Sequence, residues 1–534
     1  MRLIDQHTKQ IMEECKIYAK KAGLKFDNET LEYIVTNQDM IRLSPKVMIP
    51  TLYDYWVNDV EVLKGEGKYK VYPNNPYETV INSRPAISFY NDNNSDWMNV
   101  MIFYHVLGHI DFFQNNKLFE ATWTDDFVGQ ALADKRLIAS YRTKYHRWVD
   151  YVIEFARGID NLVNYFNILF NINNTDKIHN SNLSRKLNYY FEEFLQKIKK
   201  VPDHVLFNEI NRYNNLLNKD KDIAESLFFS GLKQKYPEFE SLYSNYNKQK
   251  KININVNDFI LENSEFLNKK ENLWMKSVIN IVKNTSMYFS PQIRSKIINE
   301  GWASYWHDNL FCQDKRIKGH EVGFAKLNSG VTSISRVGLN PYAIGLRLIQ
   351  YVEDKANKGK LSLDFQKIND YIKRNNYNTN LNEGKKAIFF LRSNFSDFML
   401  INTFVDQDFI DKYNLYVTGK RYNPKRKTIE YYVKSKKAED YKKMLIDSLY
   451  HPPHIIVNTD KTKNNLYLQH KFEGKQLIKD FIKDTMIGIE YLWGDQVDLE
   501  TTEIIKTKQK NKIKTELRKV LYTVKNKTIS KKII

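Results

Sequence analysis

Two histidines four residues apart, His105 and His109, have the spacing of side chains that share one face of a helix. Four residues advance about 400° around an α-helix, which leaves the two imidazoles roughly 40° apart. At that separation two ring nitrogens can reach one metal ion, each at about 2.0–2.1 Å. The alternative is a pair of buried histidines whose nitrogens bond to backbone or carboxylate groups. The spacing therefore predicts that the two histidines share one helix face, where they either bind a metal or make structural hydrogen bonds.

A second cluster of polar residues lies in the aromatic-rich segment Asn299 to His307. Glu300 and His307 are seven residues apart, which is two helical turns and again one face. Gly301 and Ala303 have almost no side chain, so another helix can approach this one closely. An acid and a histidine on such a helix are costly to bury unless they pair with each other or bind a metal.

Together the two segments provide a His-His-Glu set, and three protein ligands with one open position are typical of catalytic zinc. We predict that His105, His109 and Glu300 bind a divalent ion, zinc, and that His307 is a fourth ligand or a catalytic group. Thermolysin-like peptidases carry the motif H-E-x-x-H, in which the Glu activates the metal-bound water. Val106 occupies that position here, so a peptidase of the usual mechanism would lack its base.

Further residues are candidates for a base or for a group that orients a histidine. We assign Tyr305, together with His307, to the catalytic residues. Asp111 falls about 120° from the histidine face, which favours a role in capping or packing. Asp150, on a later helix, could orient a histidine through its second ring nitrogen. The whole set is Glu78, Asp111, Asp150, Tyr305, His320 and Glu321.

The composition limits the classes of protein to which the chain can belong. Two cysteines among 534 residues exclude a disulfide scaffold and a Cys-rich zinc finger, so any metal must be held by His and carboxylate. No run of 18 apolar residues exists, and the first residues lack the apolar core of a signal peptide. We therefore expect a cytoplasmic protein without a transmembrane segment. P-loop, dinucleotide-binding and nucleophile-elbow motifs are absent from the sequence.

Helical patterns carry both polar segments and predict a mainly α fold. Residues 1–400 form a predicted helical core, within which residues 165–255 are a variable helical elaboration rich in Asn and Lys. Asn28 to Thr30 precede Leu31 and Ile34 as a helix start. Residues 401–500 predict a smaller α+β domain of two hairpins and two helices, with turns at Asn423-Pro424 and Asn464-Asn465.

Positive charge is concentrated at the C-terminal end. The net charge is +19, and residues 506–534 contribute +10 of it, from eleven Lys or Arg and one Glu. We interpret residues 501–534 as a basic tail, either a solvated end of the chain or a weak binder of polyanions. A third interpretation is nucleic-acid binding through the tail. It lacks a recognised module, and aromatic residues do not alternate with the basic residues of the tail.

Five segments of the sequence together form a pattern more specific than any single motif. They are Tyr77 to Asn82, His105 to Asn116, Asn299 to His307, Asn340-Pro341-Tyr342 with Gly345-Leu346, and Tyr491 to Gly494. On these segments the chain resembles the SpoVR family, the stage V sporulation protein R-like proteins, over about residues 50 to 495. The resemblance implies a role in spore cortex formation. Because the family also occurs in bacteria without spores, it also allows a role in envelope or stress physiology. Glu300-Gly301-Trp302-Ala303 is similar to an E-G-W-A motif of some zinc-peptidase-like families, which implies a metallopeptidase-like core.

Two functions of different classes are compatible with these residues. The first is a zinc-dependent, hydrolase-like protein of the cytoplasm that acts on an amide in a peptide or a peptidoglycan-related molecule. The second is a non-catalytic, metal-containing regulator or assembly factor, in which Val106 reflects lost hydrolysis and the C-terminal region binds a partner protein.

Overall fold

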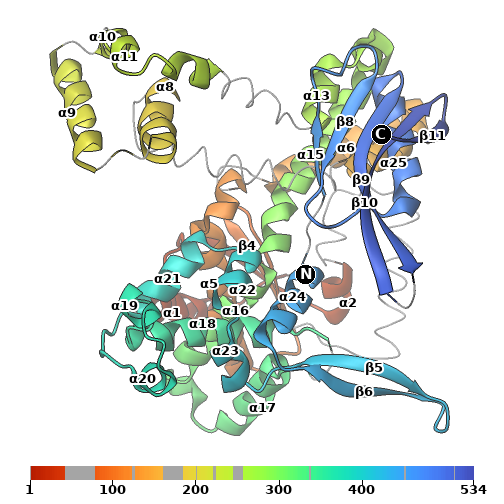
Figure 1. Cartoon of the computed structure of the whole chain (residues 1–534). Coiled ribbons are helices and arrows are strands. Elements are labelled where there is room, and N and C mark those ends of the chain that lie inside the picture. The colour runs from red at the N-terminus through yellow and green to blue at the C-terminus, as the bar shows by residue number, and fades with distance from the viewer. Residues whose placement is uncertain are drawn as a thin grey trace. The chain divides into compact units, whose positions relative to one another are not determined.

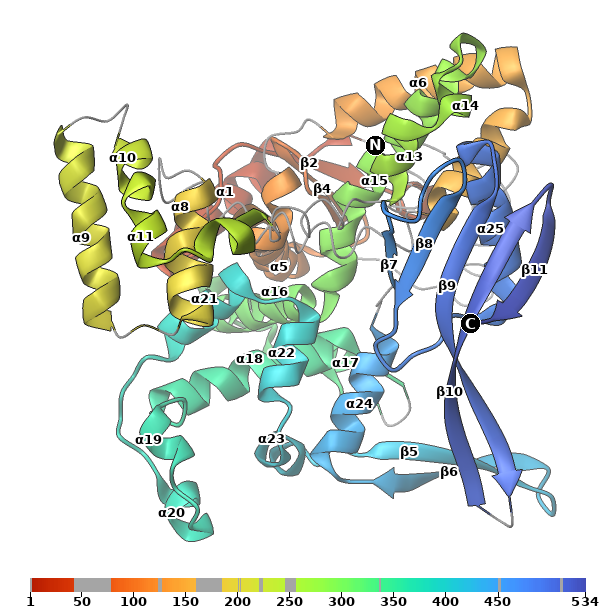
Figure 2. The ribbon, with the colours of Figure 1, turned by 45° about the horizontal axis from the view of Figure 1, so that its top comes forward.

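The structure is a computed structural model, and it divides the chain into two compact units (Figures 1 and 2). Met1–Ile153 and Asn280–His451 form the first unit, and Glu154–Ile279 and Pro452–Ile534 form the second. The chain is mostly helical with a smaller sheet-containing C-terminal region, as the sequence predicts. The structure describes residues 2–42, 78–122, 127–159, 185–199, 201, 203–219, 224–244, 256–335, 338–449, 453–509 and 512–534.

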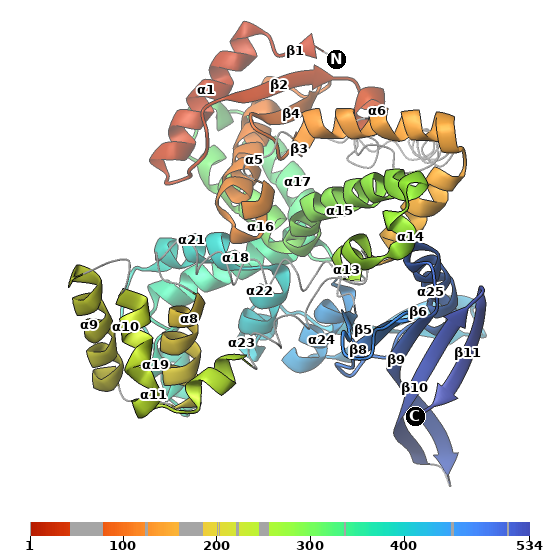
Figure 3. The same ribbon diagram turned by 90° about the horizontal axis from the view of Figure 1, so that it is seen from above.

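Three helices form the centre of the first unit, and the second of them packs against both of the others (Figure 3). They are α5 (Asp96–Asn115), α16 (Lys296–Phe311) and α18 (Pro341–Asn357). Every residue of α5 from Val100 to Phe113 is buried, as expected for a helix that is apolar almost all round. The other helices of this unit include α1 (Gln6–Lys21), α2 (Asn37–Arg42), α6 (Phe127–Tyr145), α17 (Glu321–Thr332), α19 (Leu363–Gln366), α20 (Tyr371–Asn376), α21 (Gly384–Asn394), α22 (Asp397–Phe404), α23 (Gln407–Lys412) and α24 (Ala438–Ser448).

Small residues allow these central helices to touch through their backbones. A Cβ built on Gly108 of α5 would lie 2.8 Å from the Cα of Ala303 on α16. A Cβ built on Gly301 of α16 would lie 2.3 Å from the carbonyl carbon of Gly345 on α18. The predicted close approach of another helix at Gly301 and Ala303 is therefore confirmed on both sides of α16.

The ends of two central helices are fixed by side-chain caps. The Asp397 carboxylate accepts hydrogen bonds from the backbone N–H groups of Ile297 and Ile298, at 2.9 and 2.8 Å, in the first turn of α16. Asn340 caps α18 through its Oδ1, and Pro341 fills the first helical position, where no N–H is needed. These caps fix where the two helices begin.

A four-stranded sheet near the N-terminus packs beside α5 and places one acid next to that helix. Its strands are β1 (Arg2–Leu3), β2 (Thr30–Val35), β3 (Glu78–Ile81) and β4 (Ala86–Asn91), in the order β1-β2-β4-β3. β2 runs parallel to β4, whereas β3 pairs antiparallel with β4, with Glu78 opposite Tyr90. The helix predicted from Asn28 to Ile34 is wrong, because this segment contributes β2 instead.

Both predicted hairpins are present, but they belong to different sheets. β5 (Val417–Asn423) and β6 (Thr428–Ser435) form a two-stranded sheet in the first unit. In the second unit, β7 (His454–Val457) and β8 (Leu466–Lys471) continue into a five-stranded sheet of order β11-β10-β9-β8-β7. α25 (Lys479–Trp493) lies between β8 and β9 in the sequence and packs on β9 and β10.

The residues expected to form a basic tail are strands of this second sheet. β9 (Val497–Gln509), β10 (Lys512–Lys525) and β11 (Thr528–Ile533) pair as antiparallel neighbours. Val520 and Val524 are fully buried. Alternate apolar side chains of β10 are therefore buried in the sheet. The many lysines of this segment make it resemble a solvated end of the chain.

The helices of the second unit include a small group with its own aromatic core. Phe194, Phe228 and Phe239 lie at the centre of that core, within the region expected to be a helical elaboration. None of the helices in the described ranges combines the length and the apolar character needed to cross a membrane. The main helical bounds are α8 (Arg185–Asn188), a π-helix at Tyr189–Ile198, α9 (Asp203–Lys219), α10 (Ala224–Ser230), α11 (Leu232–Lys235), α13 (Val256–Asn263), α14 (Glu265–Asn268) and α15 (Leu273–Arg294), which continues into the first unit.

Candidate metal centre

Two imidazoles and two carboxylates converge in the first unit. His105 and His109 project from one face of α5, as predicted, and their Nε2 atoms are 3.1 Å apart. Glu300 on α16 places its Oε2 3.6 Å from His109 Nε2 and 4.0 Å from His105 Nε2. Glu78, at the start of β3, places its Oε1 3.9 Å from His105 Nε2. Among the described residues, Glu78, His105 and His109 have the spacing of a metal-binding group.

A chain of hydrogen bonds fixes the tautomer of His105. The Asn328 amide nitrogen donates to Asp308 at 2.9 Å, so its carbonyl oxygen faces His307 Nε2 at 3.0 Å and accepts a hydrogen bond from it. His307 Nδ1 is then an acceptor, and it lies 2.9 Å from His105 Nδ1. His105 therefore carries its proton on Nδ1, and its Nε2 has a free lone pair.

His109 is held in the same tautomer by a neighbour of Glu300. Its Nδ1 lies 3.0 Å from the side-chain oxygen of Asn299 and donates to it, so the Nε2 of His109 is also unprotonated. The two Nε2 lone pairs thus face each other at 3.1 Å. Such a contact is repulsive unless a cation lies between the nitrogens, and two ligands of a tetrahedral zinc ion are about 3.3 Å apart.

Burial keeps the imidazoles of the site neutral and favours the protonated form of its carboxyls. Burial lowers the pKa of both His105 and His109, and it lowers the pKa of His307 to about 4. Burial raises the pKa of Glu78, and it raises the pKa of Glu300 to about 7. Neutral imidazoles have the lone pairs that a divalent ion needs, and such an ion would lower the pKa of the two carboxyls by compensating their negative charge.

One carboxylate oxygen at this site has no partner of its own. Glu300 Oε2 is buried and has no hydrogen-bond partner within the described part of the chain. The ring of Tyr342 stacks on His105 with a centroid separation of 6.2 Å, and its hydroxyl holds the pKa of Glu300 below the value that burial alone would give. The donor set of two imidazole nitrogens and two carboxylates fits zinc.

The structure places the two predicted catalytic residues outside this group of four. Both ring nitrogens of His307 are engaged, one by His105 and one by Asn328, so His307 lies behind His105. This position suits a residue that orients a ligand. The Tyr305 hydroxyl donates to the Glu353 carboxylate at 2.8 Å and is also bonded by Lys385.

The remaining candidates serve other contacts, apart from Glu78. Asp111 is fully buried and accepts a hydrogen bond from Trp302 Nε1 at 2.9 Å, as its predicted packing role requires. Asp150 pairs with Arg142, and His320 stacks on Trp97. Glu321 is an acid in the first turn of α17. The sequence marks Glu78 only as a possible base, because nothing local links β3 to the face of α5.

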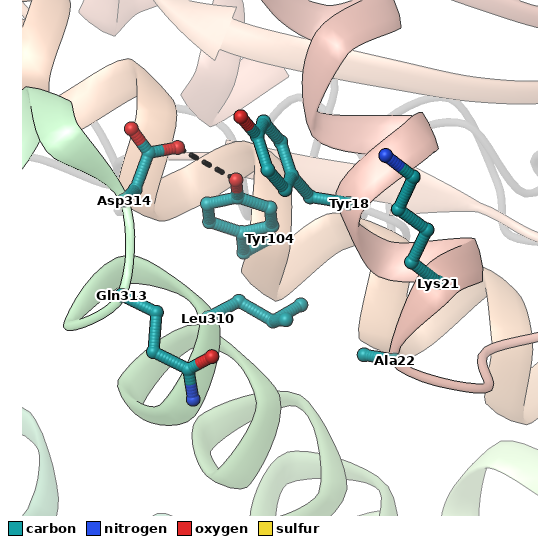
Figure 4. A pocket seen from close by; sticks show the side chains of 7 residues that line it. All are labelled: Tyr18, Lys21, Ala22, Tyr104, Leu310, Gln313 and Asp314. Carbon is teal, nitrogen blue, oxygen red and sulfur yellow. Dashed lines mark hydrogen bonds between the residues drawn. The ribbon is translucent and has the colours of Figure 1, made fainter.

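A cavity of about 220 Å³ lies elsewhere in the first unit (Figure 4). Tyr104 donates to Asp314 in its wall at 2.7 Å, and Lys21 and Gln313 also line it. Its lining contains none of the four residues of the metal group. The cavity and the metal centre are therefore separate features, although Tyr104 and His105 are neighbours in α5.

Comparison with known proteins agrees with four of the five sequence segments, because the fifth, Tyr491 to Gly494, lies beyond the matched residues. The family model described as "SpoVR like protein" matches residues 4–452. The uncharacterized protein YcgB of Escherichia coli (strain K12) is 25% identical over 337 residues, which cover 60% of this chain and 58% of that protein. The matched region is thus less than two thirds of the length of YcgB. No solved structure matches the chain. Because the family model covers most of its length, the chain belongs to the SpoVR family.

Proposed function

We propose that this SpoVR-family chain holds one divalent cation, zinc, with His105, His109 and Glu300, and that it acts as a hydrolase-like protein. The substrate class is an amide in a peptide or in a cell-wall-related molecule, in keeping with the link between the family and the spore cortex. The observation that carries the proposal is the pair of unprotonated Nε2 atoms facing each other at 3.1 Å beside two buried carboxylates. An apo site of this kind would leave both lone pairs and Glu300 Oε2 uncompensated.

A bound zinc ion supplies a Lewis acid and acidifies a water molecule, and the protein must take the proton of that water. Val106 cannot do so, although it occupies the position of the usual glutamate. Glu78 is the carboxylate that we assign to this role, because it reaches the imidazoles from a separate element, β3. Glu300 is the ligand, since its Oε2 lies closest to His109. His307 orients His105 and leaves its Nε2 free.

The second function, a non-catalytic regulator or assembly factor, is favoured by one observation. Four protein groups surround the site, and four protein ligands around zinc are typical of closed, structural centres. If Glu78 is a fourth ligand, no position remains for a substrate. The role of Glu78 therefore separates the two functions.

Metal analysis of the full chain, purified without a histidine tag, tests the centre itself. We expect about one equivalent of zinc in the wild-type protein and almost none in the His105→Ala/His109→Ala double variant. His320→Ala is the matched control, because His320 is exposed and stacks on Trp97 away from the site. A double variant that retains the wild-type metal content would overturn the proposal.

Glu78→Gln then distinguishes hydrolase from regulator. A glutamine keeps the size of the side chain but cannot take a proton. For a hydrolase we expect Glu78→Gln to retain metal and to lose complementation of a deletion strain, since a positioned base contributes about 10²–10⁴-fold to rate. A Glu78→Gln protein that loses its metal identifies Glu78 as a fourth ligand and favours the regulator, whereas a metal-replete variant that complements fully would contradict the role of Glu78 as a base.

A further inference from the structure

The hairpin of β5 and β6 has an exposed face that alternates aromatic, apolar and basic side chains. In Figure 1 it extends as a two-stranded ribbon whose turn points away from the helices of its own unit. Cross-strand pairing places Tyr422 opposite Ile429 and Tyr431 opposite Lys420 on one face. Tyr422 is 63% exposed, Ile429 58% and Tyr431 55%. Among the described residues, the two strands have no sheet partner except each other.

The hairpin carries an excess of positive charge that its own acid does not balance. Residues 417–435 contain six Lys or Arg and one acid, Glu430, which is a net charge of +5. Glu430 is already paired with Arg421 at 3.2 Å and Arg426 at 3.9 Å, on the opposite face. Four lysines have no carboxylate partner within the described ranges: Lys420, Lys425, Lys427 and Lys434.

The turn holds three of the cations in a fixed arrangement. Asn423 Oδ1 accepts hydrogen bonds from the backbone N–H groups of Lys425 at 3.1 Å and Arg426 at 3.2 Å. Lys427 closes the turn in the left-handed region, with φ of 51°. This side-chain-capped turn presents Lys425, Arg426 and Lys427 together at the tip.

We propose that this hairpin binds single-stranded nucleic acid, with bases stacked on Tyr422 and Tyr431 and phosphates at Lys420 and the turn. Proteins that bind single strands without sequence preference combine aromatic platforms with a basic surface. Tyr422 and Tyr431 are diagonal neighbours, about 7–8 Å apart, so each ring can take one base. The C-terminal basic segment lacks this alternation of rings and cations, whereas the hairpin has it on one face. The proposal is independent of the metal centre.

Binding of a fluorescein-labelled 20-nucleotide oligo(U) to the full chain, followed by fluorescence anisotropy, tests the stacking. Tyr422→Ala and Tyr431→Ala should each weaken binding by roughly five- to a hundredfold. Tyr422→Phe/Tyr431→Phe is the matched control and should stay within about twofold of wild type, since it retains both rings. Tyr422→Leu/Tyr431→Leu should bind as weakly as the Ala variants. If the Leu variant binds like wild type, the face recognises apolar protein side chains and the proposal is overturned.

The salt dependence tests the charged part. Lys425→Ala/Arg426→Ala/Lys427→Ala should reduce the slope of log K against log salt by about 2, because each phosphate contact with a single strand contributes about 0.7. An oligo(dT) of the same length should also bind, whereas polyglutamate of matched charge should compete at least tenfold less well. Equal competition by polyglutamate, or an unchanged salt slope, would overturn nucleic-acid binding. An unchanged thermal midpoint in each variant excludes unfolding of the hairpin as the cause.

Discussion

Gly301 and Gly345 face each other across α16 and α18 with no room for a side chain between them. A Cβ on Gly345 would lie 2.0 Å from the carbonyl oxygen of Ile297 and 2.8 Å from the Cα of Gly301. This backbone contact brings Glu300 on α16 and Tyr342 on α18 to the same site. The candidate metal centre therefore depends on glycines that contribute no atom to it.

Replacing Gly345 with Ala should separate these two helices. The clashing atoms are backbone, which cannot rotate away, so we expect the free energy of unfolding to fall by roughly 1–3 kcal/mol or more. Metal content should fall with it. Gly330→Ala on α17 is the control, because nothing lies within 4 Å of its Cβ and Ala is favoured by up to about 1 kcal/mol in a helix. Urea unfolding measures both, and equal midpoints for the two variants would contradict the packing argument.

His307 and Glu300 should differ in their effect on the metal. Glu300→Ala removes a predicted ligand and should empty the site. His307→Ala and Asn328→Ala remove only the groups that fix the tautomer of His105, so we expect affinity for zinc to fall by about 10–100-fold. Zinc titration against a competing chelator measures the zinc affinity of each variant. If His307→Ala loses zinc as completely as Glu300→Ala does, His307 is a ligand, which is one of the two roles that the sequence allows.

Local spacing was sufficient to predict much of the site, because helix periodicity puts His105 and His109 on one face and small residues at helix contacts. The position of Glu78 could not be predicted, since it depends on the pairing of β3 with β4 and on the packing of that sheet against α5. These are contacts between residues distant in the sequence, and the periodicity of apolar residues within one segment does not predict such contacts.

The misassigned strands have a different cause. Thr30, Ile34 and Val35 are β-branched and favour a strand, but Asn28 to Thr30 also fits a helix start, and only the parallel partner β4 decides between them. In residues 512–525, lysines hide the alternation of Val520, Tyr522 and Val524. The charged side chains described on that strand face solvent, whereas these three apolar side chains lie on its buried face.

Asp397 should make stability depend on pH. Burial raises the pKa of this carboxyl to about 7, although two backbone N–H groups donate to it. As pH rises, Asp397 therefore stays protonated to a higher pH in the folded state than in the unfolded state, where the pKa of an aspartate is about 3.9. The contribution of Asp397 is fully present below about pH 4 and is lost as pH rises to about 7, by up to about 1.4 kcal/mol per unit.

Urea unfolding of Asp397→Asn between about pH 4 and pH 8 measures this contribution. Relative to the variant, the wild-type protein should lose stability as pH rises through this range. Asp370→Asn is the control, because Asp370 caps α20 at the protein surface and asparagine caps a helix about as well as aspartate. Parallel curves for the wild-type protein and Asp397→Asn would contradict the assignment.

Removing residues 512–534 should unfold the C-terminal sheet and leave the metal centre intact. β10 pairs with β9 from Lys512 opposite Gln509 to Val524 opposite Val497, so its loss exposes the whole edge of β9 and the buried contacts of Val520 and Val524. All four residues of the metal centre lie in the first unit. We expect the thermal transition of the second unit to broaden or disappear, with zinc content unchanged. Removing only residues 528–534 is the control and should have a small effect, because β11 is an edge strand without a fully buried residue. If the longer truncation keeps the wild-type transition, residues 512–534 behave as the solvated tail that their composition predicts.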